Sequence, residues 1–362
     1  MASALLLKKK CSFKSRFSSE KAGFNALENK KIRRFIFFKL FWAGRFVFFA
    51  LFCDGISNVE AQVTDKMLSQ YMHNSLSFNP AYAGMTGKMN AAVVDRHQWT
   101  GMEGYPHTTF ISGDMSLNIL GTSGGVGLMF FNETVGYYSN LLIEGFFSRI
   151  FDMGEGKLGA GFNFGVVNVV SDGAKLIPVP EDAQGENKYH IQDDPLIPGV
   201  EVNGIGFDLG VGVYYQTPKY YAGISVLHLF QPEPDFKDEA NMYIPRTLYI
   251  TAGYNYAFWE RPVVLKPSFI IMKSASIWQF TLSTVALFKD KYWGGLSYRY
   301  QGDVSVMVGL ELPNGLKVGY CFDVPANRVA IQSSGTHEVM IGYSFDISLG
   351  KRNKRYKNVR FL

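Results

Sequence analysis

The chain has 362 residues, of which 37 are glycine and 15% are aromatic, and this length fits one large barrel or two ordinary domains. A two-domain soluble enzyme is therefore not excluded by length. The formal charge of +5 comes from residues 1–61, which hold 12 Lys/Arg and 4 Asp/Glu and leave −3 for the rest. Because nucleic-acid binding depends on a basic surface, this distribution removes its main support.

Residues 1–61 are predicted to be a leader with a signal peptide. A basic start at residues 32–34 is followed by an apolar passage that reaches residue 52, and residues 59–61 offer small side chains where signal peptidase reads. We expect cleavage before Gln62. Basic residues interrupt the apolar run, so a retained membrane helix is the weaker alternative. The upstream part is longer than a normal leader, which a start codon assigned too early would explain.

Residues 62–89 separate the leader from the first predicted strand. Pro80 disfavours a helical conformation at Asn79, and Gly84 permits a turn, so the segment is predicted to be a shaped entry into the domain that follows. We expect this entry segment to be a structural plug or a docking element on the periplasmic side.

Residues 90–348 repeatedly alternate apolar with small or polar residues, most clearly at 205–216, 304–312 and 316–323. Every second side chain on a strand points the same way, so these strands have two different faces. A soluble sandwich can alternate in this way too. Apolar faces that recur along the chain opposite Gly, Asp and Lys suit a closed barrel with lipid outside and water or packed polar groups inside. The sequence therefore predicts an all-β, transmembrane outer-membrane β-barrel.

Turn signals divide this region into about fourteen antiparallel strands of the length that a tilted membrane strand needs. They lie near residues 90–100, 108–117, 126–135, 141–151, 158–170, 205–217, 220–230, 246–258, 263–273, 278–288, 292–301, 304–312, 316–324 and 338–347. Connections after even-numbered strands are short, whereas the long ones at 171–204 and 231–245 follow odd-numbered strands. Bacterial barrels have short periplasmic turns and long outer loops, so both termini are expected in the periplasm.

The last predicted segment, residues 349–362, is a basic periplasmic tail. Such a run is usually a solvated or disordered end, and a docking role is the alternative.

Polar residues occupy one face of the first predicted strand. Arg96 and Gln98 share this face, opposite His97 and Trp99. An arginine that faces the lumen needs a carboxylate nearby, such as Asp114 in the second strand. A pair of this kind either fixes the barrel or contacts a ligand.

Catalytic and metal-binding patterns are not recognisable in the sequence. The six histidines, at positions 73, 97, 107, 190, 228 and 337, show no His-x-x-x-His or Cys/His spacing. Removal of the leader would leave Cys321 as the only thiol, so no intrachain disulfide is expected. We therefore expect no enzyme, no cofactor and no metal. A barrel lipase or protease, whose Ser/His/Asp triad is assembled in space, is the enzymatic alternative.

The order of several motifs is distinctive. Residues 70–74 precede the element Phe-Asn-Pro-Ala-Tyr-Ala-Gly at residues 78–84, which is followed by Arg-His-Gln-Trp at residues 96–99, by Pro106 and Asp114, and by a last strand at residues 337–345. This order resembles the PorP/SprF family of outer-membrane proteins of the type IX secretion and gliding apparatus of Bacteroidetes. One departure is His97, where the family more often carries Gln.

The resemblance implies a non-enzymatic component that supports secretion or surface attachment of proteins with a carboxy-terminal sorting domain, such as adhesins. The implied partners are outer-membrane lipids, periplasmic ring components of the same system and the secreted client, with no nucleic acid. The candidate partner-binding or structural residues are Asn79, Pro80, Ala81, Tyr82, Gly84, Arg96, Gln98 and Trp99. A general porin is the alternative, although fewer strands than the 16 to 18 of open porins favour a filled interior.

Overall fold

The computed structural model describes residues 65–119, 122–172, 201–234, 243–258, 261–275, 277–300, 302–326 and 328–346. The predicted leader, the cleavage site before Gln62 and the basic tail from residue 349 lie outside the described residues, as does most of the connection at 171–204.

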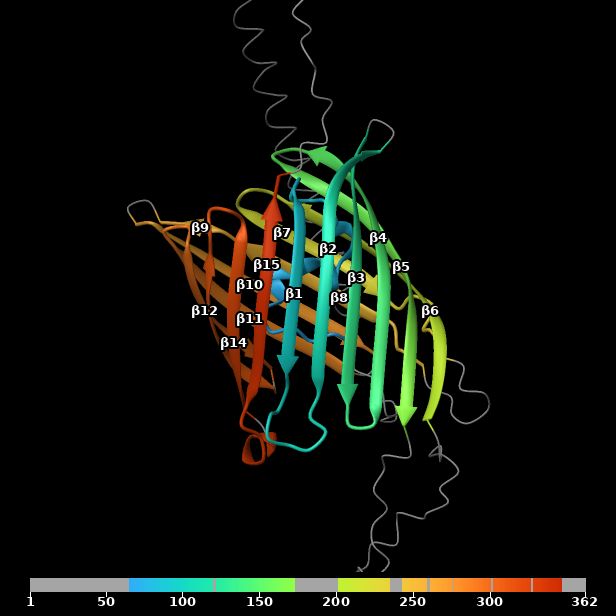
Figure 1. The fold of residues 1–362 in the computed structure, drawn as a ribbon. Helices are drawn as coiled ribbons and strands as arrows, with labels where there is room; N and C mark the ends of the chain where they lie inside the picture. The colour runs from blue at the N-terminus through green and yellow to red at the C-terminus, as the bar shows by residue number, and fades with distance from the viewer. Residues whose placement is uncertain are drawn as a thin grey trace, which may run out of the picture. The chain divides into compact units, whose positions relative to one another are not determined.

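The described strands form one antiparallel sheet (Figure 1). They are β1 (Met89–His97), β2 (His107–Ile119), β3 (Thr122–Val135), β4 (Tyr138–Met153), β5 (Gly156–Asp172), β6 (Glu201–Gln216), β7 (Tyr220–Leu227), β8 (Thr247–Tyr254), β9 (Tyr256–Ala257), β10 (Val263–Ser274), β11 (Ile277–Phe288), β12 (Tyr292–Arg299), β13 (Asp303–Glu311), β14 (Leu316–Pro325) and β15 (Thr336–Phe345). Apart from β8 and β9, which both pair with β10, each strand pairs with its neighbours in the chain, and β1 pairs with β15, which closes the sheet.

The closed barrel has 14 strands, because the short strand β9 continues β8. Both β8 and β9 pair with β10, and Asn255 is the residue that separates them. This confirms the predicted antiparallel strands in number and order. The described residues contain no helix that is long and apolar enough to cross a membrane.

Several strands end earlier than the sequence predicted, and two of them, β1 and β7, end beside a residue with a left-handed backbone. β1 ends at His97 instead of reaching residue 100, and the backbone then turns at Trp99, whose φ is 59°. β7 ends at Leu227 instead of reaching residue 230, and His228 follows with a φ of 53°. A left-handed conformation at a non-glycine residue breaks the extended geometry of a strand, which explains both early ends.

Alternation along each strand separates an apolar outer wall from a polar interior. In β13, Val304, Val306 and Val308 face outward and are 42%, 47% and 54% exposed, whereas Ser305 and Met307 face inward and are buried. Side chains on a strand point alternately to opposite faces, so one local pattern provides both surfaces. An apolar outer wall is the surface that a lipid bilayer requires.

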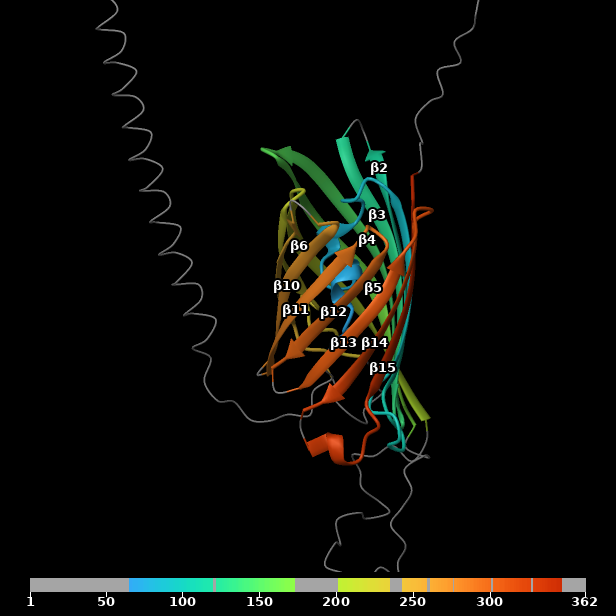
Figure 2. The same ribbon diagram turned by 90° about the vertical axis from the view of Figure 1, so that its left-hand side faces the viewer.

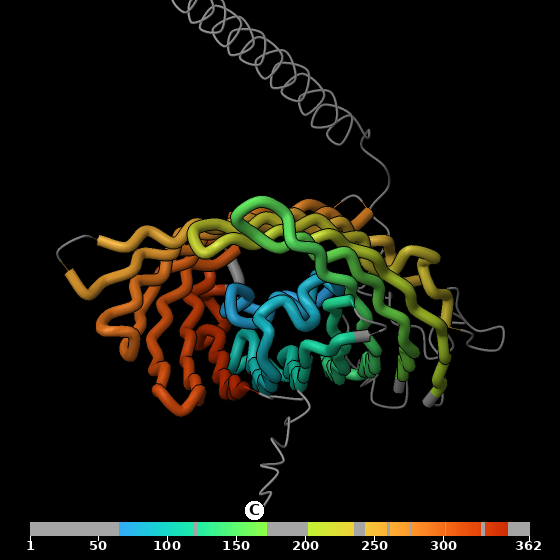
Figure 3. Tube along the Cα trace, turned by 90° about the horizontal axis from the view of Figure 1, so that it is seen from above, coloured from blue at the N-terminus to red at the C-terminus, as the bar shows by residue number. Residues whose placement is uncertain are grey.

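The chain before β1 lies inside the barrel (Figures 2 and 3). This luminal segment, residues 65–88, contains three short 3-10 helices, namely η1 (Tyr71–His73), η2 (Ser75–Ser77) and η3 (Pro80–Tyr82). A fourth, η5 (Arg328–Ile331), lies in the connection between β14 and β15, where the sequence predicted no element.

The luminal segment begins deep inside the barrel and reaches the start of β1 at one barrel end. β1 begins and β15 ends at the barrel end that carries the short connections, here called the short-turn end. Ser69 and Gln70, however, contact Arg96 and Glu338 near the opposite end, where β1 ends and β15 begins. The segment therefore runs from the long-connection half of the barrel to the short-turn end before β1 starts. The chain before residue 65 and after residue 346 lies outside the described residues, so the expectation that both chain ends lie in the periplasm stays a prediction.

Candidate functional site

The Asn-Pro-Ala motif fixes the middle of the luminal segment. Asn79 is the N-cap of η3, where its Oδ1 accepts a hydrogen bond from the Ala81 amide at 3.0 Å. Its Nδ2 donates to the carbonyl oxygens of Val213 at 3.1 Å and Ile224 at 3.4 Å, on β6 and β7. Pro80 follows at the first position of the 3-10 turn, where its fixed φ suits the turn and its missing N–H costs nothing. One asparagine thus joins the segment to two strands of the wall.

Inward glycines of β5, β6 and β7 make room for this motif. A Cβ at Gly161 would lie 2.7 Å from the Pro80 carbonyl oxygen and 2.8 Å from the Ala81 nitrogen. A Cβ at Gly223 would lie 2.8 Å from Nδ2 of Asn79. Such distances are shorter than non-bonded contacts allow, so these positions admit only glycine while the segment is in place. Packing against the luminal segment therefore explains why these inward positions are glycine.

Tyr82 and Gly84 hold the segment near the short-turn end. The Tyr82 ring packs edge-on against Tyr214 with 5.3 Å between the ring centroids. Gly84 has a φ of 70°, a conformation that favours glycine, and its amide donates to Oδ2 of Asp114 at 2.9 Å. Asp114 also accepts hydrogen bonds from the side chain of Asn90. Asp114 therefore anchors the segment itself.

Arg96 lies at the centre of a buried ion-pair cluster. Its Nη1 lies 2.9 Å from Oδ2 of Asp323 and 2.9 Å from Oε2 of Glu338, and all three side chains are at most 1% exposed. The prediction that this arginine faces the lumen beside a carboxylate is correct, but the suggested partner Asp114 is wrong. Register explains the difference: Arg96 stands opposite Glu338, whereas Asp114 stands opposite Asn90.

The same cluster binds the start of the luminal segment. The amides of Ser69 and Gln70 each donate to the Glu338 carboxylate at 2.8 Å. The Ser69 hydroxyl accepts from Arg96 Nη1 and lies 2.7 Å from Oδ2 of Asp323. Hydrogen bonds to ionised groups are roughly twice as strong as neutral ones. The segment is therefore held by charges of three neighbouring strands, β1, β14 and β15.

A second buried cluster, which the sequence analysis missed, holds residues 65 and 66. Nζ of Lys66 lies 3.2 Å from Oε2 of Glu144 on β4. Burial alone would lower the pKa of Lys66, but Glu144 and Asp65 together keep it above the usual value. Asp65 is paired with His228, whose Nε2 lies 3.3 Å from its Oδ2, and the other ring nitrogen of His228 is 3.0 Å from Asp208. Glu144 and Asp208 face inward in two predicted strands, and these inward carboxylates are the sequence signal that could have revealed the cluster.

Gln98 and Trp99 do not share faces of β1 with Arg96 and His97 as predicted, because β1 ends at His97. Both residues lie in the connection to β2. The Gln98 amide donates to the Pro106 carbonyl at 2.8 Å, and the Trp99 amide donates to Oγ1 of Thr336 at 3.1 Å. Their backbone thus shapes the rim of the barrel beside the start of β15.

Two cavities lie between the luminal segment and the wall toward the short-turn end. Their volumes are about 480 Å³ and about 260 Å³. Both are bordered by His73 and Tyr82 from the segment and by Glu311 and Lys317 from the wall. Burial lowers the pKa of His73 to about 3, and Lys317 and Lys266 act in the same direction. The cavities combine aromatic, cationic and anionic groups, which suits contact with a polar ligand or with a peptide.

Comparison with known proteins shows a distant likeness to solved barrel structures. No curated protein matches the chain. The outer membrane protein Omp33 of Acinetobacter baumannii is 8% identical, with a TM-score of 0.41 over 72% of this chain and 99% of that chain. The toluene transporter TodX of Pseudomonas putida is 12% identical, with a TM-score of 0.41 over 79% of this chain and 96% of that chain. The CymD monoaromatic hydrocarbon channel is 12% identical, with a TM-score of 0.39 over 75% and 97%.

A family model gives the identification. The model described as type IX secretion system membrane protein PorP/SprF matches residues 60–343, which include the luminal segment and all strands up to most of β15. The match thus covers both the wall and the interior, and it agrees with the order of motifs in the sequence. The chain belongs to the PorP/SprF family of type IX secretion system membrane proteins.

Proposed function

We propose that this protein is a non-enzymatic component of the type IX secretion system in the outer membrane, where it supports secretion or surface attachment of clients with a carboxy-terminal sorting domain, such as adhesins. Family membership is the observation that carries this proposal. The family is described as a membrane protein of a secretion system, and that description includes no catalytic activity.

The occupied interior supports this function over that of a general porin. A porin needs a water-filled lumen, whereas here residues 65–88 lie inside the barrel. The Lys66–Glu144 ion pair and the hydrogen bonds of Ser69 and Gln70 to Glu338 hold them at the long-connection half, and Asn79 and Gly84 hold them further along. Removing one partner of a buried ion pair strongly destabilises a protein. Displacing this segment would separate Lys66 from Glu144, so it is costly. A barrel of this kind is better suited to binding proteins than to passing solutes.

The short-turn end is the proposed docking surface for the periplasmic ring. Bacterial barrels place their short turns in the periplasm. In that orientation the cavities bordered by Tyr82, Glu311 and Lys317 open toward the periplasm. The basic tail, residues 349–362, follows β15 in the sequence and lies outside the described residues. We propose that Asn79, Pro80, Ala81, Tyr82 and Gly84 shape this surface by fixing the luminal segment.

Deletion of the gene tests the function directly. We expect surface display of one or a few large clients to be abolished and then restored by the wild-type gene. The purified barrel should carry little steady current in planar bilayers. Unchanged client secretion together with a large open-channel conductance would identify a porin and reject the proposal.

Export and orientation have their own measurement. Amino-terminal sequencing of protein extracted from outer membranes should give a sequence that begins at or near Gln62.

Epitope tags in the connections at 171–204 and 231–245 should be labelled on intact cells, whereas a tag at residues 313–315 should not. Labelling with the opposite pattern would show that the short-turn end faces the cell exterior.

A further inference from the structure

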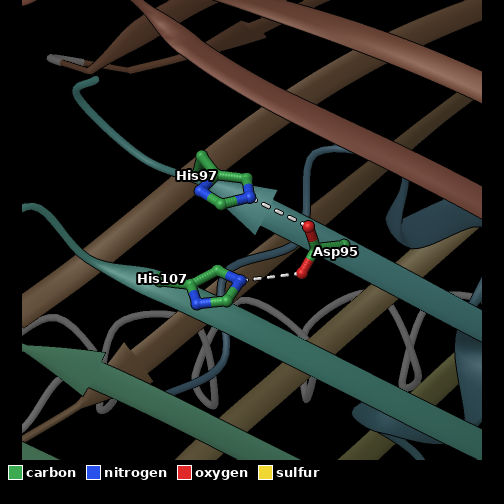
Figure 4. Close-up of side chains that lie close together, drawn as sticks. All are labelled: Asp95, His97 and His107. Atoms are coloured by element: carbon green, nitrogen blue, oxygen red, sulfur yellow. Dashed lines mark hydrogen bonds and ion pairs between the residues drawn. The ribbon is translucent and has the colours of Figure 1, made fainter. Parts of the chain in front are cut away.

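Three side chains with metal-ligating atoms meet on the outer wall of the barrel, close to the long-connection end (Figure 4). Asp95 and His97 belong to β1, and His107 is the first residue of β2. One ligand atom from each residue lies within 4.8 Å of the others. The luminal contacts described above use none of the three.

Strand register brings these residues together. His97 stands directly opposite His107, and Asp95 precedes His97 by two residues, so the three side chains share one face of the sheet. Arg96 and Thr108, which alternate with them, are buried in the lumen, and this identifies the shared face as the outer one. The nine-residue connection between the histidines, residues 98–106, explains why the sequence contained no short metal-binding spacing.

The imidazoles converge on one carboxylate. The two rings stack with 4.3 Å between centroids and an interplanar angle of 13°. Nε2 of His97 lies 2.9 Å from Oδ2 of Asp95, and Nε2 of His107 lies 2.8 Å from Oδ1. Ligand atoms around a tetrahedral zinc ion, with bonds of about 2.0 to 2.1 Å, are roughly 3.3 Å apart. A small outward movement of the three side chains would therefore place their ligand atoms at this distance from one another around one ion.

The cluster is open to solvent although its neighbours belong to an apolar wall. The side chains of His97, His107 and Asp95 are 38%, 40% and 45% exposed. Val93 and Ile111, the outward residues next to them on β1 and β2, are apolar and similarly exposed. An ion can therefore reach the ligand atoms from the water at the barrel rim, and no luminal packing depends on them.

We infer that Asp95, His97 and His107 bind a divalent transition-metal ion of the zinc, copper or nickel type. Imidazole nitrogens with one carboxylate suit these ions, whereas Mg²⁺ and Ca²⁺ prefer oxygen ligands alone. Each neutral imidazole presents its Nε2 lone pair to the ion and carries its proton on Nδ1. For His97, this proton faces the Tyr105 hydroxyl, whose oxygen lies 3.3 Å from Nδ1 and orients the ring. The remaining coordination positions face solvent.

Zinc binding to the full-length barrel, refolded in detergent without a polyhistidine tag, tests this site. Isothermal titration should show one Zn²⁺ per barrel. His97→Gln, His107→Gln and Asp95→Asn should each weaken binding by about tenfold or more, because a ligand contributes at least as much as its supporting hydrogen bonds. The electron paramagnetic resonance spectrum of the Cu²⁺ complex should show two nitrogen ligands in the wild type and one in His107→Gln.

His337→Gln is the matched control. His337 also faces outward at the rim, opposite His97 on β15, but its Nδ1 lies 2.7 Å from the hydroxyl of Tyr320 and it is not part of the cluster. This variant should bind Zn²⁺ like the wild type. Heat-modifiable migration in gels should confirm that every variant is folded. Absence of stoichiometric binding to the folded wild type, or equal loss in His337→Gln and His107→Gln, would overturn the assignment.

Discussion

The outer wall and the interior of this barrel are built from the same strands but are specified in different ways. Outward positions such as Val304, Val306 and Val308 need only be apolar, because lipid is a fluid partner that adapts to any side-chain shape. Inward positions have particular partners, as Arg96 has Asp323 and Glu338. Substitution should therefore be tolerated on the wall and poorly tolerated inside, and the strength of this contrast can be measured.

The largest effect is expected for Arg96→Met. This change removes the cation and leaves Asp323 and Glu338 buried together with the Ser69 hydroxyl, and breaking a buried ion pair from one side costs about 3 to 5 kcal/mol. Denaturant unfolding of the refolded barrel in detergent should show this loss in the free energy of unfolding. Arg96→Lys keeps the charge and should lose less. Equal stability of Arg96→Met and wild type would show that the interior tolerates change as the wall does.

A smaller effect is expected for Gly161→Ala. The added Cβ meets the Pro80 carbonyl and the Ala81 backbone, and overpacking of this kind costs roughly 1 to 3 kcal/mol. Because the contact is with the luminal segment, limited proteolysis should cut residues 65–88 faster than in the wild type.

Gly342→Ala is the matched control for this substitution. Gly342 is likewise a strand glycine, and it is buried, but the nearest atoms to a new Cβ there would be 3.7 Å away, which is ordinary van der Waals contact. Its proteolysis rate should therefore match that of the wild type. Acceleration in both variants alike would indicate a general effect of alanine in the strands.

The wall was predictable from the sequence because its signal is local. Period-two alternation is complete within one strand, so β13 could be located from residues 304–312 alone, and the short connections then gave the strand order. The structure places β13 at Asp303–Glu311, one residue from the prediction at each end. No information about distant residues was needed.

For the interior, the sequence predicted only which kind of partner a single residue needs. A lumen-facing Arg96 implied a carboxylate, but proximity in sequence suggested Asp114, whereas barrel closure brings Glu338 of β15 beside β1. The path of residues 65–88 and their pairing with Glu144 and His228 depend on contacts across the whole barrel. The faces of Gln98 and Trp99 were predicted wrongly because both residues follow the last residue of β1. The positive φ of Trp99 could not be read from the sequence. Such features require the three-dimensional arrangement.

Asn79→Ala should have an effect similar to or below that of the glycine substitution. The change removes the cap of η3 and both hydrogen bonds to β6 and β7, and loss of an asparagine cap typically costs about 1 kcal/mol. Asn79→Asp separates the two contributions, because aspartate keeps the acceptor for the Ala81 amide but cannot donate to the carbonyls of Val213 and Ile224. If the aspartate variant is as stable as wild type, the cap alone holds this part of the segment.

The smallest effect is expected on the wall, for Val306→Leu. Val306 faces outward from β13 and is 47% exposed to the surrounding medium, so the larger side chain displaces lipid or detergent and no protein group has to move. Surface substitutions without special contacts usually change stability by at most about 0.5 kcal/mol.

Met307→Leu, at the next position of the same strand, is the matched inward change, because Met307 is fully buried. Unfolding in detergent should show a larger loss for Met307→Leu than for Val306→Leu. Equal losses at the two positions would mean that lipid-facing and lumen-facing residues are under the same packing constraint, and the contrast between wall and interior would then be wrong.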